Sequence, residues 1–257
     1  MSGPILQVDN LRLEIGGRVL CRDLSLHISA GECVALLGQN GTGKTTLLHT
    51  LFNFRRPATG DILLDGRPVT EWSRKDLARH MGMLFQHMND EMPATVLETA
   101  LLGRHPHLSS WHWNIPDDVE LARDALTAVD LLPLAEREVS TLSGGERQRL
   151  AMAMLVVQNP RLYLLDEPGN HLDIAFQIRT LALLKQQIAE TGSALCMATH
   201  DINMASRFCD QVVLLLGNGE HAAGTTDEVL TPELLGRAFQ CDIQRIRHEG
   251  QWLYLPG

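Results

Sequence analysis

Short apolar runs alternate with segments of helical periodicity along this chain of 257 residues. Up to about residue 31, apolar and polar positions alternate on both sides of Gly16-Gly17, which predicts a hairpin with one buried face. A second hairpin is predicted where the apolar residues Ile62 to Leu64 meet Asp65-Gly66. Uninterrupted apolar runs predict strands that are buried on both faces, and the last of these is expected to close the sheet. They lie at 33–37, 161–168, 194–201 and 212–216.

Helical patterns fill the intervals between these runs. A helix is expected at 43–51, another within 116–131, and a long one around 173–190. A further helix is expected to begin at Ser143, because Ser143-x-x-Glu146 forms a capping box ahead of an apolar face. Strands that alternate with helices predict an α/β fold, in which a mostly parallel sheet is covered on both faces.

The segment GQNGTGKTT follows the first of the buried strands and fits the phosphate-loop pattern G-x-x-x-x-G-K-[ST]. Its glycines allow a tight turn that presents successive N–H groups to an anion, and the next helix adds the positive end of its dipole. Lys44 is predicted to bind the β- and γ-phosphates, and Thr45 to offer its hydroxyl to Mg²⁺. A glycine-rich turn with a surface lysine is the alternative, but the strand before and the helix after favour a nucleoside triphosphate site. The predicted nucleotide-binding residues are Gly38, Gln39, Asn40, Gly41, Thr42, Gly43, Lys44, Thr45 and Thr46.

The phosphate loop defines the expected fold more closely. We predict a P-loop NTPase core, with a mostly parallel sheet and an antiparallel β subdomain, and an inserted α-helical subdomain. One domain covers 1–257, since no repeat or low-complexity linker divides the chain. It is divided into a nucleotide-binding core at 1–87 and 159–238, a helical subdomain at 88–158 and a C-terminal appendage at 239–257.

Two carboxylates follow the apolar strand residues Leu162 to Leu165. Such a strand delivers them to the carboxyl edge of the sheet, where open α/β sheets bind ligands. Asp166 is predicted to hold Mg²⁺, directly or through water, and Glu167 to orient or deprotonate the water that attacks the γ-phosphorus. The alternative is that both are solvated acids at a strand end. The phosphate loop upstream favours the functional interpretation.

Residues 142–150 read LSGGERQRL and closely resemble the signature of ATP-binding-cassette (ABC) ATPases. Ser143, Gly144 and Gly145 open a helix, so they can approach a phosphate and donate N–H groups to it. The simpler reading, in which Ser143 only caps its own helix, uses the same exposed helix end and competes with this role only in part.

The resemblance implies roles for three further residues. Gln86 resembles the Q-loop glutamine, which touches Mg²⁺ or the attacking water and couples to a membrane subunit. His200 resembles the switch histidine that contacts the γ-phosphate, and Asp173 resembles the D-loop aspartate that acts across a dimer. The implied catalytic residues are therefore Glu167, His200, Gln86 and Lys44. The family closes its ATP site between two cassettes, so a homodimer is expected, with ATP and Mg²⁺ as cofactors.

The chain departs from the family pattern at two positions. Ile15 stands where an aromatic residue often stacks on the adenine, which puts nucleotide affinity and purine selectivity in question. Gly169 stands where serine or threonine usually follows the DEP tripeptide, and we expect it to loosen the loop that leads to Asp173.

The stretch LLGRHPH at 101–107 and the ending near 224–243 resemble the cassettes of importers for iron–siderophore complexes, haem and cobalamin. This resemblance implies two transmembrane permease subunits and, indirectly, a substrate-binding protein. Another importer, an exporter or a non-transport ABC ATPase are the alternatives. Arg104, His105 and His107 are interpreted as a solvated loop, and a metal site formed by the two histidines with His112 is disfavoured because the stretch is irregular.

Composition excludes several other classes of protein. The net charge of −9 argues against a protein that grips nucleic acid, so no nucleic-acid partner is expected. No apolar run approaches the roughly 20 residues of a membrane helix, and no signal-peptide pattern opens the chain. The five cysteines are scattered and are read as reduced thiols. Together with these observations, the family resemblance implies a peripheral protein on the cytoplasmic face of the inner (cell) membrane, bound there through its partners.

Overall fold

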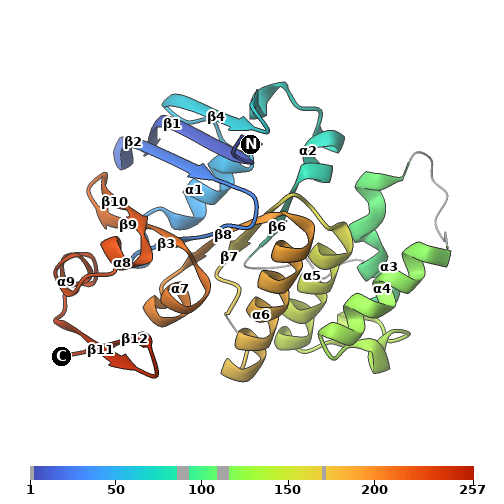
Figure 1. The fold of residues 1–257 in the computed structure, drawn as a ribbon. Coiled ribbons are helices and arrows are strands. Elements are labelled where there is room, and N and C mark those ends of the chain that lie inside the picture. The colour runs from blue at the N-terminus through green and yellow to red at the C-terminus, as the bar shows by residue number, and fades with distance from the viewer. Residues whose placement is uncertain (1–2, 86–92, 109–115, 170–171) are drawn as a thin grey trace.

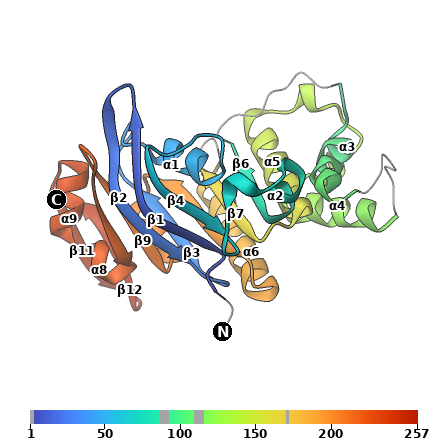
Figure 2. The same cartoon turned by 90° about the horizontal axis from the view of Figure 1, so that it is seen from above.

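The structure is a computed structural model that describes residues 3–85, 93–108, 116–169 and 172–257. Three groups of elements are visible in Figure 1: an antiparallel sheet at the top left, a larger sheet in the middle, and a helical group on the right. Figure 2 shows the helical group and the C-terminal elements at opposite edges of the larger sheet.

The antiparallel sheet contains both predicted hairpins, and its strand order is β2-β1-β4-β5. At the first turn, Gly16 and Gly17 have φ values of 56° and 80°, as a two-residue hairpin turn requires. Asp65 and Gly66 form the second turn with φ values of 48° and 76°. The strands are β1 (Leu6–Ile15), β2 (Arg18–Ile28), β4 (Thr59–Leu64) and β5 (Arg67–Pro68).

The larger sheet has the order β10-β9-β3-β8-β7-β6 and is parallel except at β10. The expectation that the run at 212–216 closes the sheet is wrong, because β10 pairs outside β9 in the antiparallel direction. The sequence of β10, EHAAGT, is small and polar and half exposed, so it has no apolar run to reveal it. The strands are β3 (Cys33–Leu37), β6 (Met81–Leu84), β7 (Leu162–Asp166), β8 (Ala194–Thr199), β9 (Gln211–Gly217) and β10 (Glu220–Thr225).

Alternating residues of β3 connect two hydrophobic layers. Val34 and Leu36 pack with α1 and the antiparallel sheet, whereas Ala35 and Leu37 pack with the helices on the opposite face. This alternation follows from the twofold periodicity of a strand. Burial on both faces explains why the strands of this sheet read as uninterrupted apolar runs. The helices are α1 (Lys44–Leu51), α2 (Arg74–His80), α3 (Val96–Leu101), α4 (Pro116–Ala128), α5 (Gly144–Gln158), α6 (Ile174–Thr191), α7 (Ile202–Phe208), α8 (Thr226–Val229) and α9 (Pro232–Phe239).

The predicted capping box opens α5. The Ser143 hydroxyl accepts a hydrogen bond from the Glu146 N–H at 3.3 Å, and the Glu146 carboxylate accepts one from the Ser143 N–H at 2.7 Å. This reciprocal pair satisfies two N–H groups at the start of the helix. At the other end of the chain, β11 (Ile243–His248) and β12 (Gln251–Pro256) form a small hairpin that contacts α7 and α9.

The LLGRHPH stretch is not a solvated loop, contrary to expectation. It forms a 3₁₀ helix, η2 (Leu102–His107), which lies against α5. The Arg104 guanidinium donates to Asp118 on α4 at 2.7 Å, and His107 Nε2 lies 2.8 Å from the Gln158 carbonyl oxygen. Burial lowers the pKa of His107, so the neutral imidazole is favoured there. These side chains hold the helical group together.

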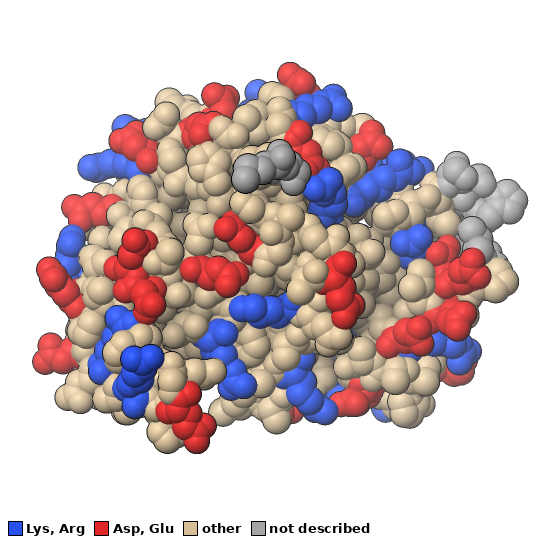
Figure 3. All heavy atoms as spheres, in the orientation of Figure 1, with Lys and Arg blue, Asp and Glu red and all other residues tan. Residues whose placement is uncertain are grey.

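No helix within the described ranges is both long and apolar enough to cross a bilayer. Acidic and basic side chains are interspersed over the face in Figure 3.

The close contact between η2 and α5 predicts that Gly103→Ala strongly destabilises the fold. An added methyl group would collide with the Met154 carbonyl oxygen, so we expect the free energy of unfolding to fall by about 2 kcal/mol. Gly236→Ala is the matched control, because its nearest atom would lie 3.4 Å away and alanine favours the helix. Urea denaturation of both variants checks this, and equal stabilities would contradict the packing described.

Candidate nucleotide site

Three adjacent parallel strands deliver the predicted site residues to one edge of the larger sheet. Leu37 at the end of β3 is paired with Thr199 at the end of β8, and Asp166 of β7 is paired with Ala198. The phosphate loop, Glu167 and His200 therefore all follow strand ends that lie side by side at this edge. The carboxyl edge of a parallel sheet is where ligands of open α/β folds bind.

The start of α1 differs from those of the other α-helices whose N-cap the structure describes. Side-chain oxygens cap α2, α3, α5, α6, α7, α8 and α9, whereas Gly43 at the N-cap of α1 has no side chain. Gly43 has a φ of 110°, and a Cβ there would lie 3.1 Å from Leu20, so only glycine fits. The first N–H groups of α1, which lack partners within the helix, point toward an anion site.

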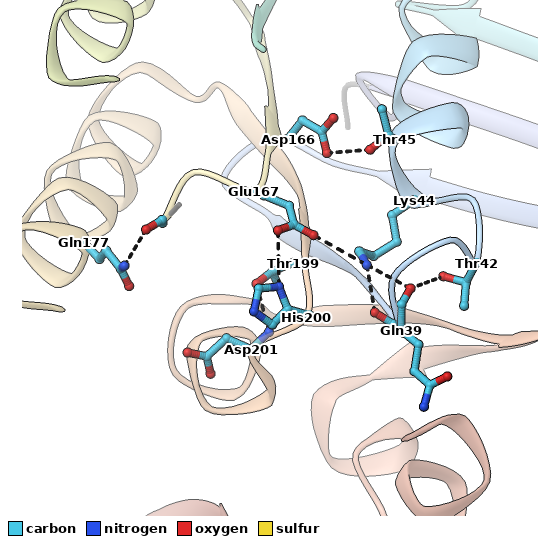
Figure 4. Close-up of polar contacts among 12 residues, drawn as sticks. Gln39, Thr42, Lys44, Thr45, Asp166, Glu167, Gln177, Thr199, His200 and Asp201 are labelled. Carbon is cyan, nitrogen blue, oxygen red and sulfur yellow. Dashed lines mark hydrogen bonds and ion pairs between the residues drawn. The ribbon is translucent and has the colours of Figure 1, made fainter. Parts of the chain in front are cut away.

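The Lys44 side chain lies inside the phosphate loop and bonds to its backbone (Figure 4). Its Nζ donates to the carbonyl oxygens of Gly38 at 2.8 Å and Gln39 at 3.1 Å. The Thr42 hydroxyl donates to the same Gln39 carbonyl at 2.8 Å. Burial lowers the pKa of Lys44, and the neighbouring Glu167 carboxylate opposes this shift. The lysine is thus a desolvated cation that a phosphate would stabilise.

Asp166 is 2% exposed and is held by Thr45, whose hydroxyl donates to its carboxylate at 3.0 Å. Burial raises the pKa of Asp166 and outweighs the opposing effect of this hydrogen bond. A buried carboxylate beside a hydroxyl is an oxygen donor pair of the kind that binds Mg²⁺ in nucleotide sites.

Glu167 lies between the lysine and the histidine. One carboxylate oxygen is 3.6 Å from Lys44 Nζ, and the other is 3.2 Å from His200 Nδ1. Its backbone has a φ of 48°, which is unusual for glutamate and is the kind of strain that clusters at functional sites. The His200 side chain is 55% exposed, so it is open to a ligand.

A cavity of about 590 Å³ extends from these residues along the phosphate loop to the first hairpin. Its volume lies in the range of sites that bind small molecules. The lining residues are Ile15, Arg18, Leu20, Asn40, Gly41, Gly43, Lys44, Thr45, Thr46, Glu167 and His200.

The sequence comparisons identify the family of this site. A model of the ABC transporter family matches residues 21–170. The iron(3+)-hydroxamate import ATP-binding protein FhuC of Bacillus subtilis (strain 168) is 36% identical over 239 residues, 93% of this chain and 89% of its own length. The chain belongs to the ABC transporter family. The petrobactin import ATP-binding protein FpuD of Bacillus anthracis is 36% identical to this cassette over 241 residues, 93% of the cassette and 88% of FpuD.

Solved structures agree with the ABC cassette fold. A chain of a metal-chelate type ABC transporter in an inward-facing conformation matches with a TM-score of 0.83 and 28% identity, over 98% of this cassette and 97% of that chain. A dimeric ATP-binding cassette in a post-hydrolysis state, bound to ADP and Pi, matches with a TM-score of 0.76 and 26% identity, over 86% of this cassette and 98% of that chain. ABC cassettes are ATPases, so the P-loop ATPase fold predicted from the sequence is confirmed.

Not all of the predicted site residues line the cavity of the cassette. Ser143, Gly144 and Gly145 are absent from its lining, and the Ser143 hydroxyl caps α5. Asp173 caps α6, where its carboxylate accepts a hydrogen bond from the Phe176 N–H at 2.8 Å. Gln86 lies outside the described residues, as does His112 of the disfavoured metal site. Among the described residues, no cluster of three or more His, Cys, Asp or Glu side chains is arranged to bind a metal.

Gly169 lies close to a side chain of α6, and the loosening expected of its loop stays a prediction. A Cβ at Gly169 would lie 2.9 Å from the Gln177 side-chain amide. That amide donates to the carbonyl oxygens of Gly169 at 2.5 Å and Leu172 at 3.0 Å. Glycine therefore makes room for a glutamine of α6 that bonds to Gly169 and Leu172.

Two contacts of the site are not apparent in the sequence motifs. The Gln39 amide donates to the Phe239 carbonyl oxygen at 2.7 Å, which links the phosphate loop to the end of α9. Arg18 lines the cavity beside Ile15. The Gly16-Gly17 turn, which sets Ile15 opposite Arg18, was the available signal for this second residue.

The buried charge of Asp166 predicts that Asp166→Asn stabilises the Mg²⁺-free cassette. A raised pKa means that the ionised carboxylate destabilises the folded state, a penalty that develops as the pH rises through the folded-state pKa. Asparagine keeps an acceptor for Thr45 without the charge, so we expect a gain of about 1 kcal/mol in unfolding free energy at neutral pH. The gain should shrink as the pH falls and disappear below the unfolded-state pKa of about 3.9, where the aspartate is protonated in both states.

Urea denaturation across this pH range measures the effect. Asp124→Asn, on an exposed position of α4, is the control and should change stability by less than about 0.5 kcal/mol. A less stable Asp166→Asn variant at neutral pH would contradict the argument.

Proposed function

We propose that this cassette is the ATP-hydrolysing subunit of an importer for an iron chelate of the siderophore class. The observation that carries the ATPase assignment is the position of Glu167, between Lys44 of the phosphate loop and His200. The iron chelate is supported by the two relatives, whose names specify import of iron(3+)-hydroxamate and petrobactin. Haem and cobalamin are the other two cargoes that the sequence pattern suggests.

ATP binding is expected to rearrange the contacts of Glu167. The triphosphate would bind at the uncapped start of α1, and its terminal phosphate would compete with Glu167 for the Lys44 ammonium. The released carboxylate is then available to orient a water molecule and accept its proton. His200, next to the other carboxylate oxygen, would contact the γ-phosphate.

Mg²⁺ fits the donors that the site offers. The Asp166 carboxylate and the Thr45 hydroxyl would hold it, with Gln86 as a further oxygen donor. When bound, the ion would neutralise charge on the phosphate oxygens. The raised pKa of Asp166 supports this, since a buried carboxylate that lacks a neighbouring cation is costly to ionise.

A second copy of the chain would complete the site. Gly144 is exposed at the start of α5, and a Cβ there would meet nothing within 4 Å, so the signature segment leaves space for a phosphate. Ile174, the residue after Asp173, is 73% exposed, which is unusual for a large apolar side chain and supports contact with another molecule. In the proposed homodimer, Ser143, Gly144, Gly145 and Asp173 of one cassette face the ATP of the other.

Two permease subunits would bind near Gln86. Phe85, which precedes Gln86 in the chain, has its ring stacked on that of Phe54 with the ring centres 5.9 Å apart, and both side chains are exposed. Exposed aromatic side chains of this kind favour a protein partner. Movement of the cassettes would reach the permease here, while a substrate-binding protein acts from the other side of the membrane. The cassette would accordingly lie at the cytoplasmic face of the inner membrane, and nucleic acid has no part in this function.

Each part of the chain has its own role in this proposal. The nucleotide-binding core at 1–87 and 159–238 holds ATP, and the helical subdomain at 88–158 carries the signature segment. The appendage at 239–257 packs against α7 and α9.

Glu167→Gln should stop turnover and leave ATP binding intact. Loss of the base is expected to slow hydrolysis by about 100- to 10,000-fold and to trap an ATP-bound dimer, visible by size-exclusion chromatography with ATP. Glu190→Gln, on the exposed face of α6, is the matched control. Normal hydrolysis by the Glu167 variant would show that another group is the base.

Lys44→Ala should weaken ATP binding by roughly 100-fold, because the phosphates lose a desolvated cation. Isothermal titration calorimetry measures this, with the exposed Lys75→Ala as control. Unchanged affinity would contradict the phosphate-loop assignment.

The cargo is tested in cells of the source organism. Deletion of the coding sequence should abolish growth on ferric siderophore as sole iron source, and wild type but not the Glu167→Gln variant should restore it. Co-purification with a polytopic permease is expected, whereas recovery with ribosomal or repair proteins alone would overturn the transport role.

A further inference from the structure

The cavity continues beyond the residues that hold phosphates. Lys44, Thr45 and Glu167 line one end, and Ile15 and Arg18 belong to the first hairpin at the other. Leu20 marks the connection between the two ends, because it lies against Gly43 of the phosphate loop. In a nucleoside triphosphate the base lies farthest from the γ-phosphate, so a bound nucleotide must direct its sugar and base toward the hairpin.

The hairpin register places two side chains beside this end. Ile15 and Arg18 are directly paired across the Gly16-Gly17 turn, and directly paired residues lie on the same face of a hairpin. Leu20, two residues after Arg18, lines the same cavity, whereas Val19 between them points to Gly219 on the opposite side. Arg18 is thus about 7 Å farther along the strand than Leu20, on the side away from the phosphates.

The guanidinium of Arg18 is available for a ligand. In the part of the chain that the structure describes, the Arg18 side chain has no hydrogen-bond or ion-pair partner, whereas Arg12 on β1 is bound by Glu14 at 2.6 Å. Ile15, its neighbour, is 38% exposed and is a large apolar side chain left open to the cavity. A planar cation beside an exposed aliphatic group forms a surface on which a flat, polarizable ring can stack.

We propose that the Arg18 guanidinium, supported by Ile15, is the surface on which the base of the bound nucleotide stacks. It takes the place of the aromatic side chain that is missing at position 15. The proposal rests on the proposed ATPase function and adds the residue that binds the base. Bases stack on guanidinium planes as well as on aromatic rings, and a purine overlaps the plane more than a pyrimidine does. The site should therefore prefer purine over pyrimidine nucleotides and discriminate little between adenine and guanine.

The test is isothermal titration calorimetry of Arg18→Ala with three ligands: ATP, UTP and inorganic tripolyphosphate, each with Mg²⁺. We expect the affinity for ATP to fall about tenfold, that for UTP to fall less, and that for tripolyphosphate to stay unchanged. Arg22→Ala, which removes the same charge from the same strand outside the cavity, should bind all three ligands like the wild type.

Arg18→Lys separates stacking from charge. Lysine keeps the positive charge but has no plane, so it should bind ATP as weakly as the alanine variant. Wild-type ATP affinity in either variant would overturn the proposal, and so would an equal loss of tripolyphosphate binding, which would indicate a phosphate contact. A wild-type chain that bound neither ATP nor tripolyphosphate would instead overturn the ATPase function itself.

A second variant tests the position of the base. Ile15→Tyr in the Arg18→Ala background supplies an aromatic ring on the same face of the hairpin and should recover most of the lost ATP affinity, with tripolyphosphate binding unaltered. Failure of the tyrosine to restore ATP binding would mean that the base does not lie on this face.

Discussion

Parallel hydrogen bonding between β3, β8 and β7 is the constraint on which the nucleotide site depends. The register brings the ends of these strands level, so that the phosphate loop meets Glu167 and His200, which follow it by more than a hundred residues along the chain. A shift of one residue in either pairing would turn the side chains at the strand ends toward opposite faces of the sheet. Because these strands are apolar on both faces, the register is fixed by the close packing of each side chain within its own hydrophobic layer.

Electrostatics then sets the state of the site. Lys44, Asp166 and Glu167 are all largely removed from water, and each is stabilised by neighbours that a nucleotide would engage. A desolvated site of this kind strengthens every charge interaction formed inside it. In this structure the lysine is bound by loop carbonyls, and the glutamate is bound by the lysine and the histidine. A nucleotide would replace these contacts.

The sequence predicts most of what local chemistry determines. The phosphate loop, the two hairpin turns and the Ser143–Glu146 capping box each depend on a few adjacent residues, and their geometry follows from those residues. The family signature adds the order of the motifs. What escapes prediction depends on distant partners: β10 has no apolar pattern of its own, and Gly103 is required by a carbonyl oxygen of α5. The close contact of Gly169 with Gln177 is likewise described by no motif. The role of Arg18 depends on the shape of a cavity, which no motif describes.

The glycine at the start of α1 sets a limit on how this protein can evolve or be engineered toward greater stability. A serine or aspartate is the usual way to strengthen a helix start and would ordinarily add about 1 kcal/mol. At position 43 such a residue would crowd Leu20, adopt an unfavourable φ, and occupy the N–H groups that a phosphate needs. Selection for a more stable empty cassette and selection for tighter nucleotide binding therefore act in opposite directions at this residue. The stability of α1 is left to the ligand, so a cell with depleted ATP would contain a cassette whose phosphate loop is also less firmly folded.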